Sequence, residues 1–284
     1  MVVSTLLDRV ERAHALDRVG DPLMRGVRAL FHGRLSDLLH GKWLGHPLHP
    51  AVMQVPFGSW TSAGILDALP GCESAATVLV GVGTATAVPA AITGFNDWST
   101  LSPEQRRVGL IHAAVNAVAV GLFTASLVAR LTGHRTRGKR LSYAGLGVVS
   151  ASAWVGGHLA YRQAASVNEA APMLHRIPQG WHYLCGYGSL TEGKPVVSHI
   201  GETPVLVTRT DGSVHVMLEH CGHQTGPLGD GEFTKVDGSD CVVCPWHGST
   251  FRLDDGSVVS GPAATAQPML RTRVVDGRVQ AALP

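Results

Sequence analysis

Four side chains able to bind a metal lie in two short motifs in the last third of the chain. Cys221 and His223 form a C-x-H motif, and Cys244 and His247 form a C-x-x-H motif. In a [2Fe–2S] cluster, two thiolates can hold one iron while two neutral imidazoles hold the other. Imidazoles in place of anionic sulfurs raise the reduction potential, to roughly −150 to +300 mV. The pattern therefore predicts a [2Fe–2S] cluster clamped between two loops.

A zinc ion is the alternative occupant, because two cysteines and two histidines also form a zinc ligand set. Zinc motifs usually pair Cys with Cys and His with His along the sequence. Here each motif supplies one cysteine and one histidine. The arrangement favours the iron–sulfur cluster and leaves zinc as the alternative.

The two motifs belong to a longer pattern of residues. It comprises Gly193-Lys194-Pro195-Val196, Pro204-Val205-Leu206-Val207, Gly226-Pro227-Leu228, the run from Cys244 to Phe251, Asp255-Gly256 and Gly261-Pro262. Over about 174–283 this pattern resembles the Rieske family, in particular its soluble ferredoxin and oxygenase branch. The resemblance implies an all-β domain that carries a [2Fe–2S] cluster.

The resemblance also assigns roles to residues beside the predicted ligands. Ser249 matches a position whose hydroxyl donates a hydrogen bond to a cluster sulfur. Two residues further on, the family often has a tyrosine that donates to a cysteine sulfur. Here that position is Phe251, so we expect a potential in the middle of the Rieske range. The quinol-oxidising branch has a disulfide at the positions of Gly226 and Trp246, and this chain lacks it. Thr225 stands where the family usually has glycine.

The composition indicates a membrane domain joined to the β domain. Of 284 residues, 45% are hydrophobic and 15% charged, and the mean hydropathy is +0.14. The net charge of +2 gives no indication of a nucleic-acid partner. We predict an α + β chain with an amphipathic region at 1–45, a four-helix transmembrane bundle at 46–165, a linker at 166–180 and the Rieske domain at 181–284.

Four apolar segments predict the membrane-spanning helices, namely 51–69, 74–95, 108–129 and 141–161. The last three contain no Asp, Glu, Lys or Arg. Each is about as long as the ~20 helical residues that cross a ~30 Å hydrocarbon core. Short connections favour an antiparallel bundle. The region 40–165 resembles an uncharacterised bacterial family of four-helix membrane proteins, on the residues 45–50, Asp67, Asn96-Asp97, His112 and Gly156-Gly157.

Histidines gather at one end of the predicted bundle. In this topology His46, His49, His112 and His158 lie at the membrane face that also holds the Rieske domain. Ionisable residues in membrane spans are costly and usually functional. Three interpretations stay open: structural hydrogen bonding, a haem b or metal site, and a quinone pocket.

The charge distribution does not decide the orientation, because basic residues are nearly balanced between the two membrane faces. The sequence shows neither a cleavable signal peptide nor the protective disulfide of the quinol-oxidising branch. We therefore expect a multi-pass cell-membrane protein with a cytoplasmic Rieske domain.

These observations predict a membrane-anchored one-electron carrier that exchanges electrons with redox proteins. An alternative is a quinol- or haem-linked oxidoreductase with a second redox site at His49, His112 and His158, and a redox sensor is a third possibility. Whether the protein is itself an enzyme stays open. An oxygenase would need a further mononuclear iron domain after the second motif, so we do not expect this chain to be an oxygenase by itself. The donor, the acceptor and the oligomeric state are not indicated.

Overall fold

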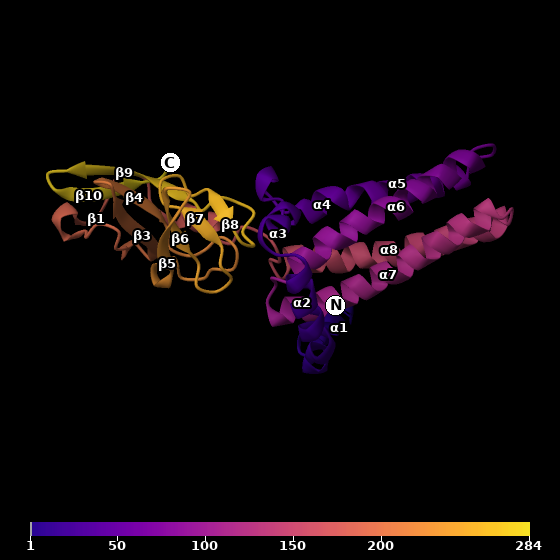
Figure 1. Cartoon of the computed structure of the whole chain (residues 1–284). Coiled ribbons are helices and arrows are strands. Elements are labelled where there is room, and N and C mark those ends of the chain that lie inside the picture. Colours follow the sequence, from indigo (N-terminus) through magenta and orange to yellow (C-terminus); the bar gives the residue numbers. More distant parts are fainter. Residues whose placement is uncertain (1) are drawn as a thin grey trace. The chain divides into compact units, whose positions relative to one another are not determined.

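The computed structural model describes residues 2–284, with side chains from residue 6 onward (Figure 1). The chain divides into two compact units. The helical unit consists of Pro47–Ala165 and the N-terminal residues through His32, and the β unit consists of Gly33–His46 and Ser166–Pro284. The predicted N-terminal region 1–45 is thus shared between the units, and the α + β composition is confirmed.

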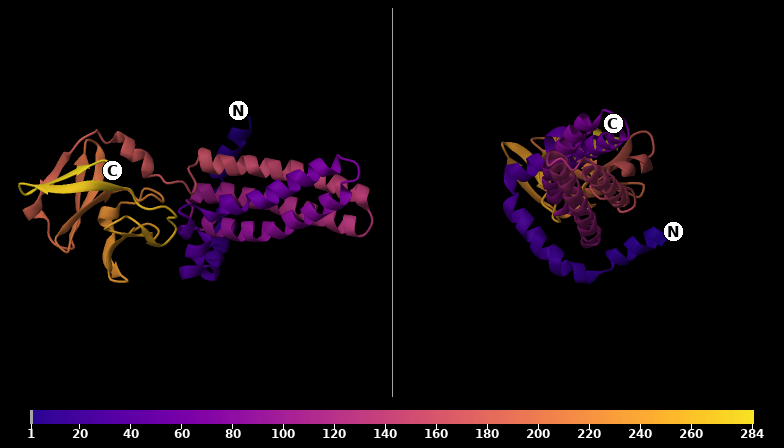
Figure 2. Two further views of the ribbon diagram at one scale, coloured as in Figure 1. Left: turned by 90° about the horizontal axis from the view of Figure 1, so that it is seen from above. Right: turned by 90° about the vertical axis from the view of Figure 1, so that its right-hand side faces the viewer.

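The helical unit is a bundle of antiparallel helices (Figure 2). Its helices are α4 (Leu48–Val52), α5 (Gln54–Asp67), α6 (Glu73–Trp98), α7 (Pro103–Leu131) and α8 (Arg135–Tyr161). Helix α5 packs on α6 and α8, and α7 packs on the same two helices. The first predicted span, 51–69, is divided between α4 and α5. Pro56 explains the break, because it has no N–H to donate to the carbonyl of Val52.

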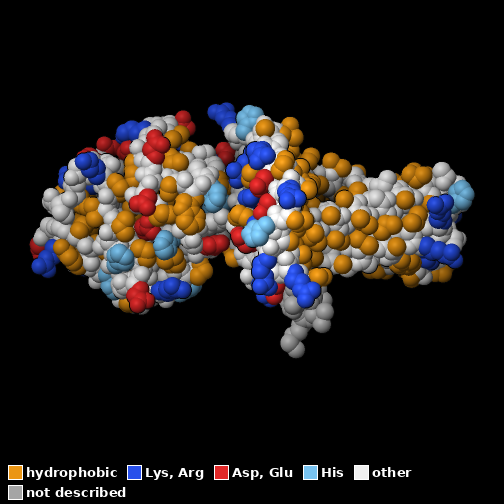
Figure 3. All heavy atoms as spheres, turned by 90° about the horizontal axis from the view of Figure 1, so that it is seen from below, with side chains coloured by type: hydrophobic (Ala, Val, Ile, Leu, Met, Phe, Trp, Pro, Cys, Tyr) orange, Lys and Arg blue, Asp and Glu red, His pale blue; other side chains and the backbone are white. Residues whose placement is uncertain are grey.

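The bundle turns apolar side chains outward and encloses polar ones. Val78, Val118 and Val128 are 55–63% exposed, whereas Ser126 and Ser152 are fully buried. Figure 3 shows hydrophobic side chains along the length of the helical unit and Lys and Arg side chains toward its ends. Inside, the Trp60 ring stacks on Phe123 with centroids 4.1 Å apart. The interior is thus apolar as well, and the bundle differs from a water-soluble one in its outer surface, which is apolar where a soluble bundle is polar.

Two of the described helices, α6 and α7, are long and apolar enough to cross a membrane. The other two helices of the predicted transmembrane bundle, α5 and α8, do not meet this criterion of length and apolar composition. Helix α5 has only 14 residues, because the break at Met53 shortens it. Helix α8 has 27 residues, but Gly, Ser and His interrupt its apolar sequence. Length and composition therefore support membrane association, and four crossings remain a prediction.

Two N-terminal helices, α1 (Val2–Glu11) and α2 (Asp17–Leu30), complete the helical unit, with the short 3-10 helix η1 (His14–Leu16) between them. Leu7 is buried against Val108 and Val155. Arg107 of α7 donates to both carboxylate oxygens of Asp17, at 2.8 and 2.7 Å. These contacts join α1 and α2 to one end of the bundle.

The β unit contains two antiparallel sheets. The six-stranded sheet has the order β1 (His182–Gly186), β10 (Arg278–Ala282), β9 (Met269–Val275), β4 (Ser213–Leu218), β3 (Thr203–Thr210) and β2 (Val196–Ile200). The four-stranded sheet has the order β5 (Glu232–Val236), β6 (Ser239–Val243), β7 (Thr250–Arg252) and β8 (Val258–Ser260). Short helical segments accompany them: α3 (Gly33–Leu39), η2 (Lys42–Leu44), η3 (Ala171–Arg176), η4 (Tyr187–Ser189) and η5 (Leu228–Asp230).

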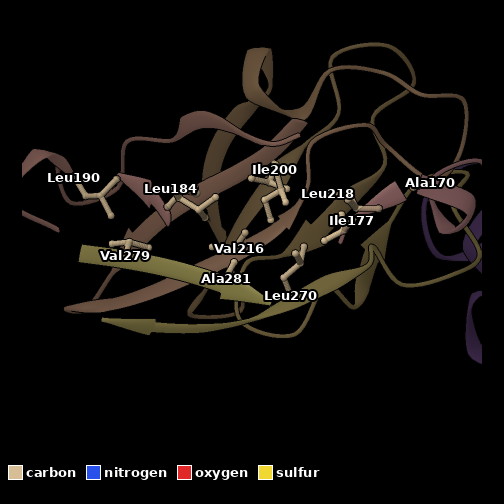
Figure 4. Close-up of a cluster of buried hydrophobic side chains, with 12 residues drawn as sticks. Ala170, Ile177, Leu184, Leu190, Ile200, Val216, Leu218, Leu270, Val279 and Ala281 are labelled. Atoms are coloured by element: carbon tan, nitrogen blue, oxygen red, sulfur yellow. The ribbon is translucent and has the colours of Figure 1, made fainter. Parts of the chain in front are cut away.

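Two hydrophobic cores stabilise the β unit. One lies on the larger sheet and includes Ile200, Val216 and Leu218 (Figure 4). The other joins the smaller sheet to the predicted cluster loops, because it contains Cys221 and Cys244 together with Phe251. The two loops that carry the predicted ligands are therefore built on a packed core.

Candidate functional site

Tight turns shape the two loops that carry the predicted ligands. The first loop follows β4, and within it the Cys221 N–H donates to the Gly226 carbonyl at 2.9 Å. Thr225 N–H returns a hydrogen bond to the Cys221 carbonyl at 2.8 Å. The second loop connects β6 to β7, and there the Cys244 N–H donates to the Ser249 carbonyl at 2.8 Å. Each cysteine is thus fixed by backbone hydrogen bonds across its own loop.

The two cysteine side chains face one another inside the β unit. Cys221 and Cys244 are 1% and 3% exposed. A hydrogen bond from the Cys221 thiol lowers the pKa of Cys244 to about 6, and the same contact raises the pKa of Cys221. A thiolate is the form that binds a metal. The paired sulfurs therefore provide a ready thiolate at a buried position.

The two histidine side chains form a second pair. The rings of His223 and His247 lie edge to face, with centroids 5.1 Å apart. The side chain of His223 is only 9% exposed, and that of His247 is half-buried. The reason is partly the packing of the His247 ring against His223. Of this pair, His247 is the more accessible to solvent.

The pairing of like residues fits a centre with two metal ions. A single zinc ion would need its four ligands gathered around one point. Among the residues that the structure describes, no three His, Cys, Asp or Glu side chains are placed to hold one ion. A pair of cysteines and a pair of histidines match the ligand set of a [2Fe–2S] cluster, in which each iron takes two protein ligands.

Glycine at position 226 allows the two loops to approach. A Cβ atom there would lie 2.7 Å from the Cys244 sulfur and 3.2 Å from the Trp246 ring. Positions 226 and 246, where the quinol-oxidising branch has its disulfide, are thus neighbours in this fold. In this chain an indole packs over a glycine, and all five cysteines are free thiols.

Thr225 keeps the first turn although it replaces the usual glycine. Its φ angle is +56°, a left-handed conformation that is unusual for a β-branched residue. The turn therefore forms with threonine at this position, at a conformational cost of about 1–2 kcal/mol.

Gln267 supports the first loop and was not recognised in the sequence. Its side chain is 1% exposed. The Gly222 N–H donates to Oε1 of Gln267 at 3.0 Å, and Nε2 donates to the Leu218 and His220 carbonyls, both at 2.8 Å. A lone glutamine outside any motif carries no signal of this role, because its partners lie more than 40 positions away.

Residues near the second loop agree with the predicted tuning. Ser249 is fully buried, and its Oγ accepts a hydrogen bond from the Ala263 N–H at 3.1 Å. The hydroxyl proton of Ser249 is then available for the predicted hydrogen bond to a cluster sulfur. Phe251 is also fully buried and packs in the core beside the two cysteines.

The histidines of the helical unit have hydrogen-bond partners inside that unit. Nδ1 of His49 lies 2.8 Å from the Ala90 carbonyl. Asn116 donates to Nε2 of His112 at 3.1 Å, so Nδ1 of His112 carries the proton donated to the Ser152 carbonyl at 3.0 Å. Nε2 of His158 lies 3.2 Å from Glu11. These contacts favour a structural role, because both nitrogens of His112 are engaged.

His46 is separate from this group, since it belongs to the residues 33–46 that pack with the β unit. The sequence interpretation treated it as the start of the membrane domain.

Comparison with known proteins identifies two families along the chain. Residues 180–274 match the Rieske [2Fe–2S] domain, and residues 45–169 match a family described as a predicted membrane protein, DUF2231. The Rieske domain implies a [2Fe–2S] cluster as cofactor and a role in electron transfer.

Several individual proteins resemble the β unit. The ferredoxin component of an alkene monooxygenase system from Xanthobacter autotrophicus is 29% identical over 96 residues, which is 34% of this chain and 75% of that protein. A human Rieske domain-containing protein is 35% identical over 57 residues, or 20% of this chain. The Sphingomonas yanoikuyae B1 ferredoxin structure is 27% identical with a TM-score of 0.33, and the match covers 37% of this chain and all of that one.

The match to other relatives is limited to part of their length. It covers 36% of the human protein and 21% of cholesterol 7-desaturase from Drosophila melanogaster, which is 32% identical over 92 residues, or 32% of this chain. Each of these matches covers about a third of this chain or less. The chain thus contains a region that matches the DUF2231 predicted membrane protein, followed by a region that matches the Rieske [2Fe–2S] domain.

Proposed function

We propose that this protein is a membrane-anchored one-electron carrier. In this proposal Cys221 and Cys244 bind one iron of the [2Fe–2S] cluster, and His223 and His247 bind the other. The observation that carries the assignment is the two-by-two pairing: buried sulfurs that share a hydrogen bond and imidazole rings 5.1 Å apart.

The cluster, when bound, supplies reversible one-electron chemistry in the potential range of imidazole-ligated centres. The protein shields the sulfur side, because both cysteines are buried. His247 lies at the more accessible side, so we place electron exchange with redox proteins there. The Ser249 hydroxyl would donate a hydrogen bond to a cluster sulfur, and Phe251 offers no second hydroxyl. The expected potential is therefore below that of the quinol-oxidising type.

The proposed anchor is the helical unit, with α4 and α5 together as the first crossing and α6, α7 and α8 as the others. Its outward apolar side chains support contact with lipid. The buried pair of Asp67 and Arg130 supports it as well, because both charges are hidden within the bundle and away from hydrocarbon. We propose a multi-pass protein of the cell membrane whose Rieske domain is cytoplasmic, where the thiols of Cys185 and Cys241 would stay reduced.

The test is a visible absorption and EPR spectrum of the detergent-purified protein, oxidised and dithionite-reduced, with iron, sulfide and zinc analysis. We expect a reduced Rieske signal that Cys244→Ser abolishes and Cys241→Ser retains, because Cys241 is a buried strand residue outside the loops. Zinc without iron or sulfide would refute the proposal. A Soret band lost in His112→Ala would instead support the haem-linked alternative.

A further inference from the structure

The segment 33–46 is part of the β unit although it lies far from the Rieske domain in sequence. It contains α3 and η2 and comes between α2 and α4, two helices of the helical unit. Helix α3 packs beside β8, the strand that precedes Gly261. The sequence indicated only an amphipathic region here and did not predict that residues 33–46 pack with the β unit.

Two side chains of this segment hold the loop that follows β8. Asp37 accepts a hydrogen bond from the Gly261 N–H at 3.0 Å through Oδ1. Its other oxygen, Oδ2, pairs with the Lys42 ammonium at 3.1 Å. Lys42 also donates to the Val259 carbonyl. The side chains of Asp37 and Lys42 are 16% and 24% exposed, so the pair is largely protected from screening by solvent.

The loop held by Asp37 rests directly on the second ligand loop. A Cβ atom at Gly261 would lie 2.6 Å from both the Gly248 carbonyl oxygen and the Ser249 Cα. Two residues further on, the Ala263 N–H donates to Ser249 Oγ at 3.1 Å. A displacement of Gly261 would therefore disturb the hydrogen bond that orients the Ser249 hydroxyl.

We propose that Asp37, supported by Lys42, is a positioning residue for the cluster. It fixes the 259–263 loop, and this loop in turn sets the direction in which Ser249 donates. The inference rests on the proposed function, because Ser249 affects electron transfer only if the cluster is bound. It assigns the segment between α2 and α4 a part in tuning the reduction potential.

Two substitutions separate positioning from charge. Asp37→Asn and Asp37→Ala both remove the negative charge and the ion pair with Lys42, but the asparagine oxygen can still accept a hydrogen bond from the Gly261 N–H. We expect Asp37→Asn to leave the Rieske EPR signal close to that of the wild type. Asp37→Ala should broaden that signal and lower the equilibrium constant for reduction at least threefold relative to Asp37→Asn, because the Ser249 hydrogen bond is weakened. Glu202→Gln, at an exposed residue before β3, is the control for net charge.

A second measurement is independent of the cluster. Amide hydrogen exchange of peptides covering 257–265, on the full-length protein as purified, should be at least tenfold faster in Asp37→Ala than in Asp37→Asn or Glu202→Gln. Equal exchange in the three variants, or equal potentials for the two Asp37 variants, would overturn the inference. A wild-type protein without a Rieske spectrum would refute the proposed function instead, and the exchange result would still decide whether Asp37 holds the loop.

Discussion

At the scale of single residues, the first ligand loop carries strain that its neighbours do not explain. Thr225 adopts a φ of +56°, and left-handed backbone costs a non-glycine residue roughly 1–2 kcal/mol. The side chain is half-buried, and the hydrogen bonds of the turn come from the backbone. Nothing in the structure explains why threonine occupies this position.

Thr225→Gly is therefore expected to stabilise the protein. The relief of strain exceeds the added flexibility of the unfolded chain, so the free energy of unfolding of the β unit should rise by about 0.5–1 kcal/mol. Thr234→Gly, in the regular strand β5, should lower it by a similar amount. Chemical denaturation of both variants tests the difference, and a loss of stability in both would contradict it.

Phe251 offers a prediction about the potential. The ring is fully buried beside the two cysteines, at the position where the family often has tyrosine. Phe251→Tyr should supply a second hydrogen bond to a cysteine sulfur and favour the reduced state. We expect roughly a tenfold increase in the equilibrium constant for reduction, which is about 59 mV for one electron. Redox titration followed by EPR measures it, with Phe251→Leu as a control that should not raise the potential.

The residues that could be recognised in the sequence are those whose chemistry constrains both type and local spacing. Cys221, His223, Cys244 and His247 are such residues, because each pair occupies one short loop. Gln267 and Asp37 could not be recognised, because they act through single hydrogen bonds to backbone groups distant in sequence. No periodicity or motif records such contacts.

At the scale of elements, the apolar segments correctly indicated the long helices α6, α7 and α8. Hydrophobicity alone could not show that α4 and α5 are separate, since that break follows from the missing N–H of Pro56. Nor could it assign α3 to the β unit, because the contact that holds α3 there is the hydrogen bond between the Asp37 carboxylate and the Gly261 N–H.

The pair of Asp67 and Arg130 joins two of these elements, α5 and α7. Nη1 and Nη2 of Arg130 donate to the Asp67 carboxylate, at 2.9 and 2.5 Å, and the two side chains are 2–3% exposed. Asp67→Ala would leave a buried arginine without its counter-charge, at a cost of about 3–5 kcal/mol. Asp67→Leu combined with Arg130→Met should be less destabilising than Asp67→Ala alone. Thermal unfolding in detergent tests this order, and the reverse order would contradict it.

At the scale of the whole molecule, the chain joins a unit suited to lipid and a unit suited to water. The helical unit exposes valine and leucine side chains that favour lipid, and the β unit has two packed cores of its own. Each unit can therefore be understood from its own surface and core. In the proposed topology the chain crosses the membrane an even number of times. The N-terminus and the Rieske domain are then on the same side.

This topology predicts opposite sides of the membrane for two cysteine positions. Cys72 lies in the connection between α5 and α6, so one crossing separates it from the N-terminus and three from the Rieske domain. A membrane-impermeant maleimide should label wild-type protein in intact cells and should not label Cys72→Ser. In Cys72→Ser combined with Glu202→Cys, labelling should require permeabilised cells, because position 202 is exposed on the β unit. The inverse pattern would place the Rieske domain outside, and labelling of both positions from one side would exclude an odd number of crossings between them.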